Sequence, residues 1–217
     1  MFYLIANWKA HMTQDGVNEW LKIFKNEYVP SEHISIIICP PIIQLETLAS
    51  HLESVKNVFL GVQDTSRFPR GSFTGETPAE LLPTYVRYGI IGHAERRQYF
   101  GETNTDVAEK VKQLAARTIK PIVCVRSSAD TVPSQSQLVA YEPESSIGSD
   151  RAAPVEEAVE TKKNLHLTAE QLFIYGGNVN KDTVHGFVKS NEVSGFLVGR
   201  ASLNPRDLLS IASKCVV

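Results

Sequence analysis

Eight short runs of apolar and β-branched residues recur along the chain, separated by longer stretches whose apolar residues have helical spacing. Strands that are covered on both faces have continuous apolar runs of this kind, as at Ile36, Ile37 and Ile38. Alternation of such strands with helices predicts repeated βα units around a parallel sheet. The eight predicted strands cover residues 2–6, 35–39, 58–63, 88–91, 121–125, 138–141, 172–175 and 195–198.

The residues after the first predicted strand favour a closed barrel over an open, doubly wound sheet. An open sheet normally carries a glycine-rich nucleotide-binding loop at this point, whereas Asn7, Trp8 and Lys9 follow here. The length of 217 residues suits one large α/β domain. We therefore predict an α/β chain folded as a (β/α)8 barrel, a single domain that covers residues 1–217.

One interval does not fit the regular alternation. Only twelve residues, 126–137, separate the fifth and sixth predicted strands, and they include Pro133 and several serines. A full crossover helix does not fit in this space, so we predict that the fifth helix is shortened or missing. Elsewhere, Thr77-Pro78 and Asn204-Pro205 each place a capping side chain before a proline, which predicts two helix starts.

Charge and cysteine content exclude several classes of protein. The formal net charge is −2 and the basic residues are spread along the chain, so we expect no nucleic acid partner. The first residues lack the basic leader of a secretory signal, and we expect a cytoplasmic protein with no membrane partner. The three cysteines have no metal-ligand spacing, and their odd number suits a reducing compartment; we expect neither metal nor disulfide.

In a parallel barrel, functional residues lie at the carboxyl ends of the strands. Lys9, His93 and Glu142 each follow a predicted strand, and a cation, an imidazole and a carboxylate are the groups needed to abstract a proton beside a carbonyl. Each also has a plain structural interpretation. Lys9 could be a solvated surface lysine, His93 could be held by backbone groups, and Glu142 could form an ion pair with Arg96 or Arg97.

Several sequence motifs resemble those of triosephosphate isomerase, and they follow one another in the order of that family from the first strand to the last helix. The resemblance implies a TIM barrel. The motifs are NWK at residues 7–9, FTGE at 73–76, GHAERRQYFGE at 92–102, AYEP at 140–143, YGGNV at 175–179 and GFLVGRASL at 195–203.

The resemblance also implies a reaction, the interconversion of dihydroxyacetone phosphate and D-glyceraldehyde 3-phosphate in glycolysis and gluconeogenesis, without metal or organic cofactor. In this family Glu142 would be the general base that moves a proton between neighbouring carbons. His93 would polarise the carbonyl as a neutral imidazole, and Lys9 would supply fixed positive charge to the enediolate and phosphate. Asn7 would help to position the substrate.

A phosphate site, a lid and a partner subunit are implied in the same way. The substrate phosphate would be bound by backbone N–H groups of Gly148, Asn178, Gly199 and Arg200. Residues 143–151 would form a lid that excludes water. The loop at residues 73–76 resembles the one that the family inserts into a second subunit, so we expect a homodimer or a higher homo-oligomer.

Departures from the family pattern leave two alternatives open. Glu144 and Ser145 replace an apolar residue and a tryptophan in the lid, Arg200 replaces the second glycine of the phosphate site, and Ala94 replaces a serine; Arg126-Ser127 also replaces a glycine and a glutamate. The first alternative is a related aldose–ketose isomerase acting on another small phosphosugar. The second is a barrel that binds phosphorylated metabolites without catalysis.

Overall fold

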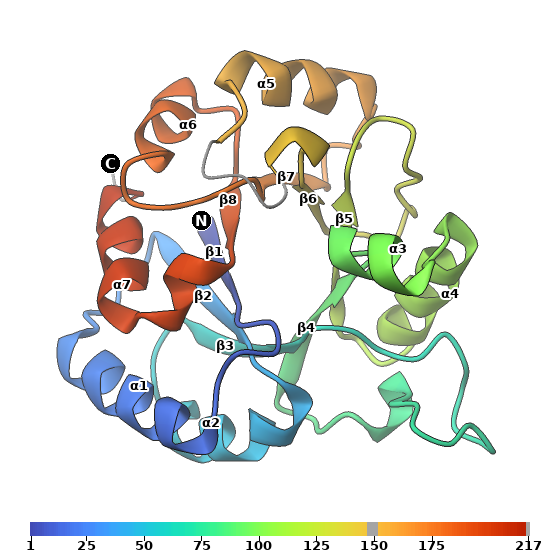
Figure 1. Ribbon diagram of the computed structural model, residues 1–217, viewed down its shortest axis with the longest axis horizontal. Helices are drawn as coiled ribbons and strands as arrows, with labels where there is room; N and C mark the ends of the chain where they lie inside the picture. Colours follow the sequence, from blue (N-terminus) through green and yellow to red (C-terminus); the bar gives the residue numbers. More distant parts are fainter. Residues whose placement is uncertain (147–151, 216–217) are drawn as a thin grey trace.

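A computed structural model describes residues 1–146 and 152–215, and its eight strands form a closed, entirely parallel barrel (Figure 1). The predicted barrel fold is therefore confirmed. Neighbours in sequence are neighbours in the sheet, and β1 pairs with β8 to close it. The strands are β1 Phe2–Asn7, β2 Ile34–Cys39, β3 Val58–Val62, β4 Val86–Ile91, β5 Lys120–Val125, β6 Leu138–Tyr141, β7 Leu172–Tyr175 and β8 Gly195–Val198.

Helices surround the barrel on the outside (Figure 1). In the described residues the α-helices are α1 Gln14–Glu27, α2 Leu45–Leu52, α3 Ala94–Phe100, α4 Asn104–Ala115, α5 Val155–Asn164, α6 Val184–Ser190 and α7 Pro205–Lys214. Four 3₁₀ turns accompany them: η1 Ile42–Gln44, η2 Ala79–Leu81, η3 Glu144–Ser146 and η4 Arg200–Leu203.

Alternate side chains of each strand pack into two separate cores. In β1, Leu4 and Ala6 point outward and pack with the helices, whereas Ile5 points into the barrel. All three are fully buried, which explains why the strand has an unbroken apolar run and no polar alternation. The barrel interior is thus filled by side chains, as in other eight-stranded barrels, and an open cavity is left at its mouth.

The connection between β5 and β6 contains no helix. Residues 126–137, all of which the structure describes, form turns and bends only, so the predicted loss of the fifth helix is confirmed. The connection is held instead by Asp130, whose carboxylate accepts a hydrogen bond of 2.8 Å from the backbone N–H of Arg126.

The two predicted helix starts have different outcomes. Asn204-Pro205 is confirmed, because Pro205 is the first residue of α7 and the Asn204 side chain accepts the N–H of Arg206. Thr77-Pro78 is wrong as the start of an α-helix, since only the single 3₁₀ turn η2 follows Pro78. Pro83 comes two residues after that turn, and proline prevents helix continuation there.

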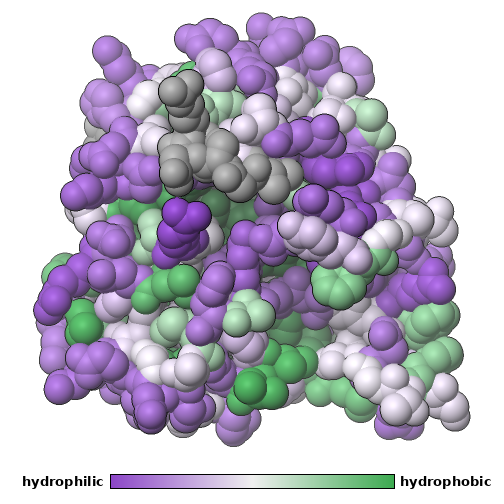
Figure 2. Space-filling model, viewed as in Figure 1, coloured by the Kyte–Doolittle hydropathy of each residue, from purple (hydrophilic) through white to green (hydrophobic). Residues whose placement is uncertain are grey.

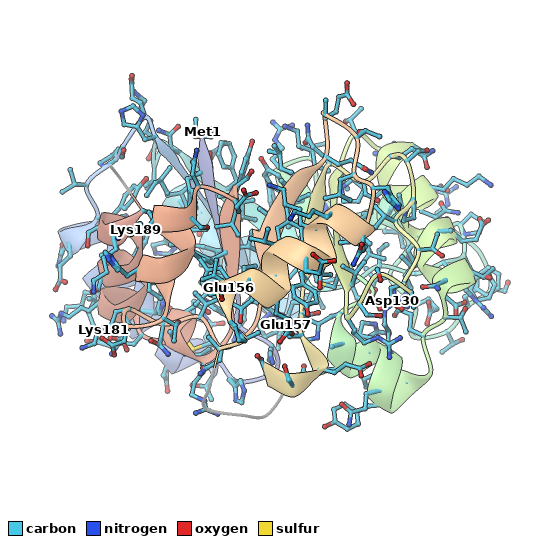
Figure 3. The ribbon with its side chains drawn as sticks, turned by 90° about the horizontal axis from the view of Figure 1, so that it is seen from above. Met1, Asp130, Glu156, Glu157, Lys181 and Lys189 are labelled. Atoms are coloured by element: carbon cyan, nitrogen blue, oxygen red, sulfur yellow. The ribbon has the colours of Figure 1, made fainter. Side chains whose placement is uncertain are left out.

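The strands run from the end of the barrel that carries Met1 toward the opposite end, as the side view in Figure 3 shows. The carboxyl ends of all eight strands therefore meet at one mouth. Within the described part of the chain, no helix combines the length and the apolar composition needed to cross a membrane.

Candidate active site

A cavity of about 470 Å³ lies at the carboxyl-terminal mouth of the barrel. It is lined by residues from the ends of β1, β4, β6, β7 and β8, so segments far apart in the chain converge on it. All but one of the residues that the sequence analysis predicted for the site line this cavity; they are Asn7, Lys9, His93, Glu142, Asn178, Gly199 and Arg200. The exception, Gly148, lies outside the described residues.

His93 and Glu142 form a buried pair at the base of the cavity. The distance from His93 Nε2 to Glu142 Oε1 is 2.9 Å, and the two side chains are only 8% and 7% exposed. The second carboxylate oxygen of Glu142 accepts a hydrogen bond of 3.0 Å from the backbone N–H of Ala94. Glu142 is therefore bound to the imidazole and to the first residue of α3, and the alternative in which it pairs with Arg96 or Arg97 is wrong.

The hydrogen bonds around His93 define its tautomer. His93 is the N-cap of α3, and its Nδ1 accepts the backbone N–H of Glu95 at 3.2 Å. Since Nδ1 acts as an acceptor, the ring proton is on Nε2, which donates to Glu142. The observed bonds therefore fit a neutral imidazole, because protonation of Nδ1 would break the cap of α3.

Each member of this pair changes the pKa of the other. Burial is the largest influence on His93 and lowers its pKa, but the charge and hydrogen bond of Glu142 outweigh burial and the net shift is upward. Burial raises the pKa of Glu142, yet His93, the N–H of Ala94 and the thiol of Cys124 together lower it. A carboxylate in this place is therefore ionised and available as a base at neutral pH.

Lys9 is held in a fixed position beside this pair. Its ammonium donates a hydrogen bond of 2.6 Å to Glu95 Oε1, and its backbone has a positive φ of 50°, which is uncommon for a residue other than glycine. Its backbone N–H donates to Asn7 Oδ1 at 3.1 Å, and its carbonyl accepts from Gln63 Nε2 at 2.8 Å. Glu95 thus binds the ammonium, whose side chain is 33% exposed, and Asn7 and Gln63 bind the backbone.

In the part of the cavity near β7 and β8, side chains pack closely against glycine residues. A Cβ atom at Gly177 would lie 2.7 Å from the hydroxyl of Tyr175 and 2.9 Å from Cδ of Pro143, so only glycine fits there. Gly199 lies beside Lys9, because a Cβ at Gly199 would be 3.6 Å from the Lys9 Cε. Arg200 follows Gly199 as the first residue of η4. Two glycines, Gly177 and Gly199, and two basic residues, Lys9 and Arg200, thus line the same cavity.

Several supporting residues were not predicted from the sequence. Glu102 accepts the backbone N–H of Gly92 at 3.0 Å and also binds Arg96 and Lys110, so it fixes the loop that carries His93. Gln63 and Glu95 hold Lys9. Glu95 and Glu102 lie within the motif at residues 92–102, and that motif is the signal that could have indicated them.

The described residues 1–146 and 152–215 contain no group of three or more His, Cys, Asp or Glu side chains that could hold a metal ion. Four of the charged or titratable side chains of the cavity form two pairs, Lys9 with Glu95 and His93 with Glu142.

Comparison with known proteins finds one family that matches almost the whole chain. The family model described as triosephosphate isomerase matches residues 2–215. The chain is 31% identical over 244 residues to the triosephosphate isomerase of Coxiella burnetii (strain Dugway 5J108-111), covering 97% of this chain and 95% of that protein. It is also 31% identical over 247 residues to the triosephosphate isomerase of Caldanaerobacter subterraneus subsp. tengcongensis, with coverages of 97% and 98%. For the triosephosphate isomerase of Lactobacillus acidophilus the identity is 29% over 244 residues, with coverages of 97% and 96%.

Proposed function

Because the chain belongs to the triosephosphate isomerase family, we propose that Glu142, His93 and Lys9 carry out the family's reaction in the cavity described above. The chain is an aldose–ketose isomerase that interconverts dihydroxyacetone phosphate and D-glyceraldehyde 3-phosphate, a step of glycolysis and gluconeogenesis. The observation that supports these three residues most directly is the buried contact of 2.9 Å between His93 and Glu142, with the ammonium of Lys9 on the same cavity.

Glu142 is the general base of this proposal. Its carboxylate takes a proton from one carbon of the triose and returns it to the neighbouring carbon, so no proton or electron is lost overall. For this step Glu142 must exchange its bonds to His93 and Ala94 for a contact with the substrate. The His93 Nε2–H is then free to donate to the substrate oxygen on which negative charge develops.

Lys9 stabilises that negative charge. Its ammonium is already held by Glu95 on one side, so little rearrangement is needed when the enediolate forms. Asn7 fixes the backbone of Lys9 and also lines the cavity. The backbone N–H groups of Asn178, Gly199, Arg200 and Gly148 bind the phosphate; the cavity wall formed by the first three supports this assignment.

Replacement of Glu142 tests the proposal. Glu142→Gln keeps the shape of the side chain but removes the base, so we expect turnover in a coupled isomerase assay to fall by about 10²–10⁴-fold. Glu160→Gln is the matched control, because Glu160 lies exposed on α5 and bonds only to Asn164 among the described residues. A folded wild-type protein that turns over no faster than Glu142→Gln would refute the assignment.

Arg200 bears on the alternative substrate, since it is one of the residues that line the cavity, at a position where the family pattern has glycine. We expect the three-carbon pair to remain the preferred substrate, with a higher kcat/KM than any four-carbon phosphosugar. The variant Arg200→Gly separates the contributions of the Arg200 side chain and backbone to phosphate binding. A loss of affinity for inorganic phosphate in this variant would show that the guanidinium contacts the anion, and an unchanged affinity would leave the backbone as the binding group.

We also propose that the protein forms a homodimer or a higher homo-oligomer. Apolar side chains are exposed on η1, α3 and η2, among them Ile43 at 84%, Phe100 at 72% and Leu81 at 56%, and Figure 2 shows hydrophobic residues gathered over η1. Ile42 and Phe100 line a groove of about 780 Å³, together with residues of the loop after β3. Light scattering after size exclusion tests this: Ile43→Asp should increase the monomer fraction, whereas Val29→Asp, at a distant exposed apolar residue, should not.

A cytoplasmic location is part of the same proposal. The substrates are phosphorylated glycolytic metabolites, and the three cysteines are free and buried. Fractionation of cells that express the tagged protein tests the location, and recovery in the secreted or membrane fraction would contradict it.

A further inference from the structure

Asp130 organises the helix-free connection between β5 and β6. It is only 7% exposed, and its Oδ2 accepts both the backbone N–H of Arg126 at 2.8 Å and the Nε–H of the same residue at 3.0 Å. Its Oδ1 accepts a third bond of 2.9 Å from Arg126 Nη2. A buried carboxylate with this many donors holds the turn in one conformation and fixes the guanidinium of Arg126.

The same carboxylate faces a second, fully buried arginine. Asp130 Oδ1 lies 3.6 Å from Arg97 Nη1, and the Arg97 side chain is 3% exposed. Arg97 Nε donates a hydrogen bond of 2.8 Å to the carbonyl of Gly92, the residue before His93. In Figure 3 the labelled Asp130 lies on the side of the barrel where α3, the helix of Arg97, is found.

Arg126 extends this chain of contacts toward the other member of the catalytic pair. Its Nη1 lies 3.7 Å from Glu144 Oε1, and Glu144 is two residues after Glu142. The backbone N–H of Glu142 in turn donates to the carbonyl of Val125 at 2.8 Å, directly before Arg126. The ends of β5 and β6 are therefore joined by one backbone bond and one ion pair, and Asp130 determines the place of the arginine.

Removal of this carboxylate would leave two guanidinium groups without their shared anion. Arg97 is too deeply buried for water to replace the carboxylate as its partner, and an unpaired buried charge destabilises the folded protein. We therefore expect Arg97 to shift, and with it the Gly92 carbonyl that it holds. A shift of about 1 Å at a reacting group can reduce a rate by about 10²-fold.

We propose that Asp130 is a positioning residue of the isomerase: through Arg97 it places His93, and through Arg126 it places the segment that carries Glu142. The proposal rests on the assignment of His93 and Glu142 as the catalytic pair. A connection without a helix has few backbone hydrogen bonds of its own. The cluster of Asp130, Arg97 and Arg126 holds the adjacent strand ends instead.

Asp130→Asn tests the proposal, because it removes the charge and keeps the shape. We expect kcat to fall about tenfold or more, while the inhibition constant for inorganic phosphate stays within about twofold, since the phosphate end of the cavity lies on other loops. Glu192→Gln is the control. Glu192 lies in the loop before β8, at the amino-terminal end of the barrel, and pairs with Lys162 of α5. Removal of this carboxylate should change neither kcat nor the inhibition constant for phosphate.

A double-mutant cycle separates positioning from general stability. Arg126→Gln alone should reduce kcat, and combined with Asp130→Asn it should reduce kcat by less than the product of the two single effects, because both act through one cluster. If Asp130→Asn does not fold, Arg126→Gln and Asp130→Glu take its place in the same assay. A wild-type kcat in every folded variant of this set would overturn the proposal.

A readout that does not depend on turnover distinguishes failure of this proposal from failure of the catalytic assignment. Ring ¹⁵N signals of His93, assigned by comparison with His93→Gln, report its tautomer directly. In the wild type we expect the proton on Nε2, and in Asp130→Asn a displaced or exchanging signal. Wild-type protein without turnover would refute the catalytic assignment, whereas an unchanged His93 signal in Asp130→Asn would overturn the positioning role.

Discussion

Gly92, directly before His93, has two independent reasons to be glycine. Its φ is +74°, and a Cβ atom there would lie 2.8 Å from Val107 Cγ2 and 3.3 Å from the carbonyl oxygen of Cys124. Val107 is fully buried and branched at Cβ, so it cannot move aside easily. Gly101 has a similar φ of +66°, but a Cβ atom at Gly101 would meet nothing within 4 Å. The two glycines thus share a backbone conformation and differ in the space around them.

This difference predicts the stability of two alanine variants. The left-handed conformation costs a residue other than glycine about 1–2 kcal/mol, and overpacking a dense core costs about 1–3 kcal/mol more. Gly101→Ala should therefore lose about 1–2 kcal/mol, from the backbone alone, and Gly92→Ala about 2–5 kcal/mol, from both causes. Gly92→Ala should also reduce kcat, because it displaces the segment that carries His93.

Urea unfolding followed by tryptophan fluorescence measures both losses, since Trp8 and Trp20 are buried. The protein concentration must be the same in each experiment, because association would add to the apparent stability. The reasoning is refuted if the two variants lose the same free energy within about 0.5 kcal/mol, the error expected of such comparisons. That result would mean that the contact with Val107 relaxes at no cost.

Three further predictions concern single ionisable groups. Hydrogen bonds from Thr103, followed by those from Arg67, lower the pKa of Asp106 from 3.8 to about 2; the stability that this carboxylate contributes is present above pH 4 and lost as the pH falls through 2. In Asp106→Asn, the unfolding free energy should therefore depend less on pH between pH 4 and pH 2 than it does in the wild type, and an unchanged pH dependence would contradict the prediction. Lys9→Met should reduce kcat/KM by about 10²–10³-fold but change the unfolding free energy by less than about 1 kcal/mol, and a large loss of stability would assign Lys9 a structural role. Burial raises the pKa of Cys39 and Cys124, and that of Cys215 to about 12; mass spectrometry should find all three unalkylated by iodoacetamide in native protein at pH 8 and modified in urea.

Most of the fold could be predicted from the sequence, because a barrel strand is buried on both faces and its apolar run is visible without knowledge of its partners. The predicted and observed strand starts differ where a polar residue lies at the strand end. We predicted that β4 begins at residue 88, whereas it begins at Val86, because the exposed Arg87 interrupts the apolar run. β5 begins at the exposed Lys120 for a similar reason. A polar residue at a strand end pairs through its backbone, and its side chain gives no sign of that pairing.

The candidate site was predictable only in part. Lys9, His93 and Glu142 follow predicted strands, and closure of the barrel alone brings strand ends together. Gln63 and Asp130 gave no such signal, since Gln63 binds the backbone of Lys9, and Asp130 binds Arg126 of its own connection and faces Arg97 on α3. The contacts of Gln63 with Lys9 and of Asp130 with Arg97 join segments that are distant in the sequence.

The sequence by itself determined the strand and helix segments, the absence of the fifth helix and the chemical groups at the strand ends, because these follow from local apolar patterns and connection lengths. Only the tertiary structure decided how those groups are paired. Glu142 binds His93 and not an arginine, and Lys9 binds Glu95, 86 positions further along the chain. Such choices depend on distances between the ends of different strands, and those distances exist only after all eight strands have closed.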